Sequence, residues 1–489
     1  MSTAFKSLIK CSVTSAILSL SAAISSQAVA QTPNSNATKQ PNILFILADD
    51  HRWDLIGKYH PIIKTPNLDE LANEGAFFKN TFVTTPICAS SRVSILTGLT
   101  ERTHDFTFGQ PKTGQFESQH VYPQILKQNG YLSAFVGKYE IKLSGESTDR
   151  FDYFKPLLQA KINEYEGKSI PQSYYIAELA MDFIEQSKTA NKPWTMSVNF
   201  WNPHAHDRDT EDQYHYPAEF ENYYQDVTIP PAKFSTDKAF NNLPEFLQQS
   251  IGRVRWEYRY GSEEIYQKMV KRHYRAISAV DKAVGKIVKK LEDVGVADNT
   301  VIIYTGDNGY NINERQLAGK WFGWEEDLRV PLIIYDPRNK ALSGKEPSAM
   351  ALNIDIAPTI LNLAGVQTPK YYQGKSLKPI LNGQVPDDWR NEFFFEHMYQ
   401  PKRVSIPPTV GLRTESWKYI NFYKNDFQQL YDLRKDPEEE HNLAYSPAYQ
   451  AKLQALKART EQYINQYETE RSEEVKQRGS FHNSSPEHQ

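Results

Sequence analysis

The sequence predicts an α/β protein: a large mixed, mostly parallel sheet sandwiched by helices, followed by a smaller C-terminal subdomain of antiparallel sheet plus helix. Two patterns support this prediction. Uninterrupted apolar runs alternate with segments of helical period over most of the 489 residues, and such runs are typical of parallel strands buried on both faces. From about Asp387 the apolar runs become short and closely spaced, which indicates antiparallel pairing.

The first predicted strand covers 43–48, an apolar run that ends at Asp49 and Asp50. The later elements follow from the same patterns of apolar periodicity and helix-ending residues. We expect further strands of the main sheet at 131–136, 194–200 and 301–305, and helices at 68–72, 122–129, 174–187, 263–294 and 352–364. We expect C-terminal strands at 393–396, 410–413 and 417–422, and a final helix that turns Leu453, Leu456, Thr460, Tyr463 and Tyr467 to one side.

A further helix is predicted just after Cys88. The run 93–96 is typical of a first helical turn, with Ser90 or Ser91 as its N-cap. Backbone N–H groups at such a helix start, together with the guanidinium of Arg92, would form a pocket for an oxyanion. The alternative is a small buried cysteine at a loop–helix junction, which is common for free cysteines.

The N-terminus predicts export. Lys6 and Lys10 precede a stretch of small and apolar residues that ends at Ala28-Val29-Ala30, and these are the parts of a secretory signal peptide. We therefore expect a periplasmic or secreted protein. The predicted parts are a signal peptide at 1–30, a disordered linker at 31–40, a catalytic domain at 41–385, a C-terminal subdomain at 386–475 and a polar tail at 476–489.

Composition narrows the function classes. The formal net charge of −3 gives no chain-wide basic field, so we expect no nucleic-acid partner. No late segment approaches the roughly 20 apolar residues of a membrane span, so we expect no membrane anchor. The chain has two cysteines, and Cys11 falls in the predicted signal peptide. Cys88 would then be unpaired in an oxidising compartment, which marks it as a functional candidate.

Paired oxygen ligands follow two predicted strands. Asp49 and Asp50 follow the first strand, and Asp307 and Asn308 follow the strand at 301–305. The carboxyl ends of such strands are where open α/β sheets place their sites. A cage of carboxylate and amide oxygens suits Ca²⁺ or Mg²⁺ better than a soft metal. The alternative is a pair of solvated acids in a turn.

Residues 207–261 are loop-rich and dense in Tyr, Trp and Pro. A connection of this length in a compact domain is usually functional, so we expect it to form walls of a substrate site. Several cations in and after it are either anion contacts or the solvated face of a helix. These cations are Arg253, Arg255, Lys268, Lys271 and Arg272.

The segment Cys88-Ala89-Ser90-Ser91-Arg92 resembles the Cys-x-Pro/Ala-x-Arg signature of type I sulfatases in the alkaline phosphatase superfamily. Ser90 differs, because the family usually has Pro or Ala at that position. Other segments resemble family segments in the same order, from Pro41 to Leu443. The resemblance thus covers nearly the whole chain after the linker, and it implies a carbohydrate or polysaccharide sulfatase.

In that family a maturase oxidises the cysteine to formylglycine, whose hydrate is the nucleophile. The resemblance implies the same fate for Cys88 and a Ca²⁺ ion, with Mg²⁺ as the alternative. The implied metal ligands are Asp49, Asp50, Asp307, Asn308 and the oxidised Cys88. The implied catalytic residues, which bind sulfate or transfer protons, are Cys88, Arg92, Lys138, His204, Lys320 and Glu140.

Glu140 stands where the family has a histidine that receives the last proton. Either Glu140 takes that proton, or a histidine from another position, His51 or His104, replaces it. We expect hydrolysis of sulfate esters on a sulfated polysaccharide or oligosaccharide, with a formylglycine-generating maturase as a second partner. One alternative is a non-catalytic relative that binds sulfated glycans, with Ser90 blocking maturation. The other is a phosphodiesterase or phosphonate hydrolase of the same superfamily.

Overall fold

The computed structural model describes residues 39–108, 111–401 and 404–478. The predicted signal peptide at 1–30 and linker residues 31–38 lie outside the described residues, as does the tail from 479 on. Residues 476 and 477 of the predicted tail belong to helix α15 (Glu473–Gln477). The predicted limits of the catalytic domain and C-terminal subdomain stay predictions.

The main sheet confirms the predicted mixed, mostly parallel arrangement. Its seven strands lie in the order β2-β12-β9-β1-β8-β4-β5. The strands from β9 to β5 run parallel, whereas β12 pairs antiparallel with both β9 and β2. In that order the strands are β2 (Ala76–Phe77), β12 (Leu332–Tyr335), β9 (Thr300–Gly306), β1 (Asn42–Ala48), β8 (Trp194–Asn199), β4 (Leu132–Lys138) and β5 (Tyr153–Leu157).

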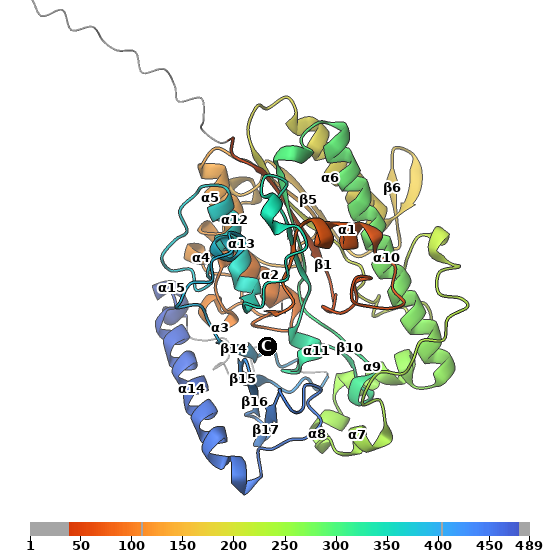
Figure 1. Ribbon diagram of the computed structural model, residues 1–489, viewed down its shortest axis with the longest axis vertical. Helices are drawn as coiled ribbons and strands as arrows, with labels where there is room; N and C mark the ends of the chain where they lie inside the picture. The colour runs from red at the N-terminus through yellow and green to blue at the C-terminus, as the bar shows by residue number, and fades with distance from the viewer. Residues whose placement is uncertain (1–38, 109–110, 402–403, 479–489) are drawn as a thin grey trace, which may run out of the picture. The chain divides into compact units, whose positions relative to one another are not determined.

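Strand β1 is buried along its whole length because helices cover both faces of the sheet. Its residues alternate between two cores: Phe45 belongs to one and Ile46 to the other. One core includes side chains of α2 (Cys88–Thr97), α5 (Tyr122–Gln128) and α12 (Ile356–Leu363), and the other includes those of α1 (Pro66–Glu74), α6 (Gln172–Ser187) and α10 (Glu263–Asp293). Figure 1 shows the two helix groups on opposite sides of β1. Burial on both faces explains why this strand is uniformly apolar.

The C-terminal sheet has four antiparallel strands in the order β14-β15-β16-β17. Helix α14 (Gln450–Thr469) covers one face, where its Leu453 and Leu456 join a core with Leu412. On the other face, Phe395 belongs to the same core as Phe322 of the main body. The fourth strand was not predicted. The strands are β14 (Glu392–His397), β15 (Thr409–Thr414), β16 (Trp417–Phe422) and β17 (Phe427–Asp432).

The segment 207–261 is only partly the loop that its composition predicts. It contains α7 (Asp237–Asn241), α8 (Glu245–Gln248) and α9 (Ile251–Tyr260). Helix α9 packs along β11 (Ala318–Gly319), so tertiary contact stabilises a helix that composition did not indicate. The other short elements are β3 (Thr81–Phe82), β6 (Ile162–Tyr165), β7 (Lys168–Pro171), β10 (Asn311–Ile312), β13 (Ala351–Leu352), α3 (Glu101–His104), α4 (Gln115–Gln119), α11 (Glu325–Leu328) and α13 (Lys378–Leu381).

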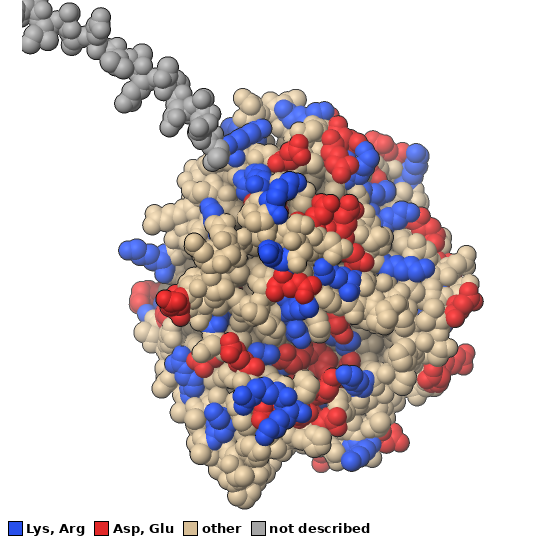
Figure 2. Space-filling model, viewed as in Figure 1, with Lys and Arg blue, Asp and Glu red and all other residues tan. Residues whose placement is uncertain are grey.

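Charges of both signs are interspersed on the face shown in Figure 2. This distribution agrees with the nearly balanced composition of 56 basic and 59 acidic residues. Among residues 39–108, 111–401 and 404–478, none of the helices combines the length and the apolar character needed to cross a bilayer.

Candidate active site

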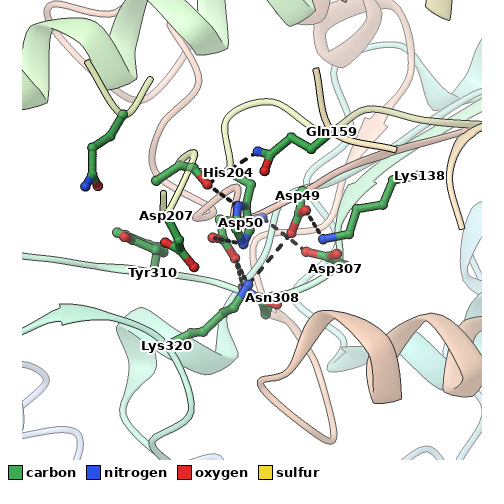
Figure 3. A network of polar contacts seen from close by, with 12 residues as sticks. Asp49, Asp50, Lys138, Gln159, His204, Asp207, Asp307, Asn308, Tyr310 and Lys320 are labelled. Atoms are coloured by element: carbon green, nitrogen blue, oxygen red, sulfur yellow. Dashed lines mark hydrogen bonds and ion pairs between the residues drawn. The ribbon is translucent and has the colours of Figure 1, made fainter. Parts of the chain in front are cut away.

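Four neighbouring strands of the main sheet carry the predicted site residues to one edge. Strands β9, β1, β8 and β4 are consecutive and parallel, so their carboxyl ends lie together. The polar side chains there are Asp307 after β9, Asp49 after β1, His204 beyond β8 and Lys138 at the end of β4. Figure 3 shows them converging. This is the edge at which open α/β sheets hold ligands.

The oxygen ligands predicted on two separate strands are in direct contact. The backbone N–H of Asp50 donates to Asp307 Oδ1 at 3.1 Å, and Asn308 Nδ2 donates to Asp50 Oδ1 at 2.6 Å. Asp50 has a φ of 61°, a conformation that is uncommon for a residue other than glycine and that clusters at functional sites. The structure thus brings both pairs of oxygen ligands into one buried cluster.

Two lysines neutralise these acids. Lys138 forms an ion pair with Asp49, and Lys320 lies 2.5 Å from Asp50 Oδ1 and 3.8 Å from Asp49 Oδ1. Burial by itself would raise the pKa of Asp49, but Lys138, His204 and Lys320 hold it well below its usual range. Lys320 follows β11, so a short strand outside the main sheet brings it to the cluster.

Two buried oxygens in this cluster have no hydrogen-bond partner among the described residues. They are Asp49 Oδ1 and Asn308 Oδ1, and an unpaired buried acceptor is destabilising unless something binds it. Asp49, Asp50 and His204 each offer a ligand atom within 4.8 Å of the others. Carboxylate and amide oxygens are the donors that Ca²⁺ and Mg²⁺ prefer, so the residues fit a divalent cation.

Cys88 lies at the start of α2 and is 1% exposed. Burial raises the pKa of its thiol, against the opposing effect of Lys138 and Lys320. The predicted N-cap is wrong: α2 begins at Cys88, after the extended residue Ile87, and none of the described side chains caps it. Because Cys88 itself opens the helix, Ser90 lies inside the first turn.

Ser90 has buried partners of its own. Its hydroxyl lies 3.2 Å from Glu101 Oε1 and 3.1 Å from the carbonyl oxygen of Phe106. Burial and the nearby Glu396 raise the pKa of Glu101 to about 8. The hydroxyl at this motif position is therefore accommodated by polar groups on the segment after α2.

Arg92 connects three elements of the site. Its Nε and Nη2 lie 2.9 and 2.8 Å from Asp307 Oδ2, and Nη1 donates to the carbonyl oxygen of Lys138 at 2.9 Å. The contacts link α2 to the ends of β9 and β4. Arg92 therefore orients Asp307, and its predicted contact with sulfate stays a prediction.

His204 and Glu140 flank the cluster. His204 Nδ1 lies 2.6 Å from the carbonyl oxygen of Ala205, which assigns the proton to Nδ1, and Nε2 lies 3.8 Å from Asp50 Oδ2. Burial lowers the pKa of His204. The Glu140 side chain is 37% exposed and lies 3.2 Å from Lys138 Nζ.

Two family models match the chain. Residues 41–366, well over half of the chain, match the sulfatase family model, and residues 313–466 match the family described as "N-sulphoglucosamine sulphohydrolase, C-terminal". The chain belongs to the sulfatase family. It is therefore a sulfuric ester hydrolase of the alkaline phosphatase superfamily, as the resemblance implied.

Three similar proteins each match most of the sulfatase. An N-acetylglucosamine-6-O-sulfatase from Bacteroides thetaiotaomicron is 30% identical over 502 residues, covering 89% of this chain and 88% of that protein. A solved structure of a protein with its substrate D-glucosamine-2-N,6-O-disulfate is 27% identical, with a TM-score of 0.75 over 88% of this chain and 99% of that one. A phosphonate monoester hydrolase from Silicibacter pomeroyi has a TM-score of 0.74 at 21% identity over 88% of this chain and 96% of that one, and shares the fold.

The two histidines that were alternatives to Glu140 make internal contacts in the sulfatase. The ring nitrogens of His51 lie 2.6 Å from Tyr304 Oη and 2.9 Å from the carbonyl oxygen of Leu55. Those of His104 lie 3.0 Å from Ser94 Oγ and 3.1 Å from the backbone nitrogen of Phe106. Burial lowers the pKa of His51 to about 4 and that of His104 to about 3. Both side chains are therefore bound within the fold.

Sequence reasoning missed several residues that line the sulfatase site. The ring of Trp201 lies 4.4 Å from Lys138 Nζ, and Asn199 Oδ1 accepts from Arg92 at 3.4 Å. Asp207 lies near His204 (Figure 3) and forms ion pairs with two arginines of α9. Asn199 is the last residue of β8, and Trp201 and Asp207 come two and eight residues after it. Their position at and after the end of a predicted strand was the signal available in the sequence.

Proposed function

We propose that this sulfatase cleaves sulfate esters from a sulfated polysaccharide or oligosaccharide, with 6-O-sulfated glucosamine units as the first substrates to test. The observation that carries the proposal is the buried cluster beside Cys88, where two pairs of oxygen ligands meet two lysines. The substrate class is supported by the relative named N-acetylglucosamine-6-O-sulfatase and by the relative solved with glucosamine-2-N,6-O-disulfate.

Asp49, Asp50, Asp307 and Asn308 would hold a Ca²⁺ ion, with Mg²⁺ as the alternative. Cys88, once oxidised to formylglycine and hydrated, would supply a hydroxyl nucleophile toward sulfur, and a divalent cation held there would lower the pKa of that hydroxyl. The protein's own charges prepare the site for an anion. Three acids face three cations in the cluster, Asp49, Asp50 and Asp307 against Arg92, Lys138 and Lys320, so the acids do not produce a field that repels sulfate.

Lys138 and Lys320 are the sulfate-binding groups in this proposal. Burial would lower the pKa of Lys138, but Asp49 raises it, so the side chain stays charged at neutral pH. Two ammonium groups fixed in a buried site stabilise charge on the ester oxygens more than they would in water. Arg92 contributes by holding the carboxylate of Asp307 in place.

His204 serves as the acid for the leaving oxygen. Its Nδ1 is bound to Ala205, so Nε2 is the atom that exchanges a proton with substrate. To act as the acid, His204 must be an imidazolium with a second proton on Nε2, which passes to the leaving oxygen while the Nδ1 proton stays bound to Ala205. Its lowered pKa makes that imidazolium a stronger acid. Glu140 is proposed as the acceptor of the last proton, because its exposed carboxylate adjoins Lys138 and the other two candidate histidines are bound elsewhere.

We also propose that the sulfatase is exported to the periplasm or the medium, after removal of 1–30. Its other partner would be a formylglycine-generating maturase acting on Cys88. Sequencing the N-terminus of the mature protein tests the first point. A mature protein that still begins at Met1 would contradict it.

The deciding experiment combines mass spectrometry and desulfation assays. The protein is produced with a formylglycine-generating maturase, and the peptide that contains Cys88 is examined for the aldehyde. We expect the aldehyde together with sulfate release from 6-O-sulfated glucosamine saccharides. Activity with an unmodified thiol would refute the formylglycine mechanism. Binding without turnover would favour a non-catalytic relative that binds sulfated glycans. A preference for matched phosphonate or phosphate esters would favour a phosphodiesterase or phosphonate hydrolase.

A further inference from the structure

The five cations that sequence analysis left open have different environments. Lys268 and Arg272 approach Asp212 at 3.5 and 3.4 Å, and Lys271 donates to the carbonyl oxygen of Gln225 at 3.2 Å. Arg253 donates to Gln316 Oε1 at 2.9 Å and stacks on two rings of its own region. Arg255 differs, because its contacts lead to residues beside the sulfatase site.

Arg255 joins the two segments that carry His204 and Lys320. Its Nη2 donates to Asp207 Oδ2 at 2.5 Å, and Asp207 is three residues beyond His204. Its guanidinium carbon lies 4.8 Å from the ring centre of Trp321, which directly follows Lys320. Figure 3 places Asp207 on the His204 side of the cluster. The guanidinium is thus fixed beside the site by an acid and an aromatic ring.

The Trp321 platform has a strained backbone. Trp321 has a φ of 93°, which is unusual for a bulky residue and persists only where surrounding contacts enforce it. Gly319 permits the arrangement, since a Cβ at that position would lie 2.8 Å from the Trp321 ring. Such strain is typical of ligand-binding segments, and here it fixes the ring beneath Arg255.

The local charge balance leaves Arg255 available to an anion. Asp207 is shared by Arg255 and by Arg259, whose Nη2 lies 2.7 Å from Oδ1. Arg259 is fully buried and also donates to Gln213 and Tyr310. Arg255 is 15% exposed and, among the described residues, donates only to Asp207. Asp207 neutralises only one of the two arginines, so one positive charge remains. We assign it to Arg255, because Arg255 is the arginine that solvent reaches.

We infer that Arg255 is a specificity-determining residue that binds a second anionic group of the substrate, beyond the ester that is cleaved. This inference rests on the proposed function. The group is a sulfate, a sulfamate or a carboxylate, because a guanidinium fork matches these planar or tetrahedral oxyanions. It belongs either to the sugar that carries the scissile ester or to the neighbouring sugar.

The test measures binding and turnover separately for Arg255→Gln and for Arg253→Gln, a matched control two residues away on α9. The ligands are glucosamine 6-sulfate, glucosamine N,6-disulfate and a disaccharide with a uronate beside 6-sulfated glucosamine. Binding is measured by calorimetry and turnover by sulfate release. We expect the wild type to bind one of the two doubly charged ligands about tenfold more tightly than the singly charged one, the size of one charge-assisted hydrogen bond.

Arg255→Gln should abolish that preference without changing binding of glucosamine 6-sulfate, and Arg253→Gln should keep it. The N,6-disulfate and the uronate disaccharide distinguish the two sources of the anion. Equal weakening for all ligands, or no preference in the wild type, would overturn the inference. A preference that depends on Arg255 in a protein that releases no sulfate would refute the proposed function and leave the anion site standing.

Discussion

The amide N–H of Asn308 donates to Asp50 Oδ1 at 2.6 Å, whereas its buried amide oxygen has no hydrogen-bond partner in the part of the chain that the structure describes. Asp49 Oδ1 likewise has no partner among those residues. When the N–H of an amide donates to an acid and its oxygen has no donor, that oxygen is oriented to bind a cation together with the acid. This relationship joins the ends of β1 and β9.

Adding Ca²⁺ to metal-free protein should raise the melting temperature, because a ligand that binds only the native state stabilises it by about 2.7 kcal/mol at 100 times its Kd. Asn308→Ala should reduce that shift. The measurement is thermal unfolding with and without Ca²⁺ after treatment with a chelator. Asn425→Ala, at an exposed turn, is the control and should respond as the wild type does. Equal shifts in both variants would exclude Asn308 as a ligand.

Lys320→Met should lower sulfate-ester hydrolysis by roughly 100- to 1,000-fold, the range for removing one preorganised group that stabilises developing charge. It should also destabilise the metal-free protein, since Asp50 loses a buried partner at 2.5 Å. Ca²⁺ should therefore restore more stability to this variant than to the wild type. Kinetics and thermal unfolding check the two effects. An unchanged Ca²⁺ response would show that Lys320 and the cation do not share Asp50.

Ser90→Ala should lower the free energy of unfolding by about 1 kcal/mol, because it removes the hydroxyl that contacts Glu101 and Phe106. The variant has a residue that the family signature accepts, so oxidation of Cys88 should be at least as complete as in the wild type. Denaturant titration and mass spectrometry provide the two readouts. Poorer oxidation in this variant would mean that the Ser90 hydroxyl assists maturation.

Asp281 makes stability depend on pH. It accepts from the backbone of Leu68 at 2.8 Å and from Asn67 at 2.7 Å at the start of α1, yet burial raises its pKa to about 7. A raised folded pKa favours the protonated form, so this contribution is complete below about pH 4 and is lost as pH rises to about 7.

Asp281→Asn should therefore flatten the stability curve between about pH 4 and pH 7, because the amide keeps an acceptor for Leu68 without the titration. The measurement is the free energy of unfolding of both proteins across that range. Asp298→Asn, at an exposed position, provides the control and should follow the wild type. Parallel curves for the wild type and Asp281→Asn would show that Asp281 is already ionised at pH 4.

Much of the main sheet could be predicted from local sequence. The strand predicted at 43–48 is observed as β1, Asn42–Ala48, with the acids directly after it, because a strand buried on both faces must be apolar until it leaves the sheet. The long helix predicted at 263–294 is observed as α10, Glu263–Asp293, because one face repeats apolar residues at helical spacing. The fourth C-terminal strand, β17, was not predicted.

The start of α2 shows why local patterns fail at the site. Serine is a common N-cap, so Ser90 or Ser91 was expected as the N-cap of this helix. In the structure Asn353, far along the chain, donates to Ser91 Oγ at 2.9 Å, and Ser90 bonds to Glu101. Both serines therefore form hydrogen bonds with residues beyond the helix, and the helix begins at Cys88.

The sequence alone determined that strands with apolar interiors carry acids, a lysine and a histidine past their carboxyl ends, because burial and periodicity are encoded in neighbouring residues. Only the tertiary structure decided that Lys320 pairs with Asp50 and that Arg92 holds Asp307. It also decided that the guanidinium of Arg255 packs over the ring of Trp321. These partners are separated by dozens to hundreds of residues. Their contacts depend on the order in which the strands pack, and no local pattern records that order.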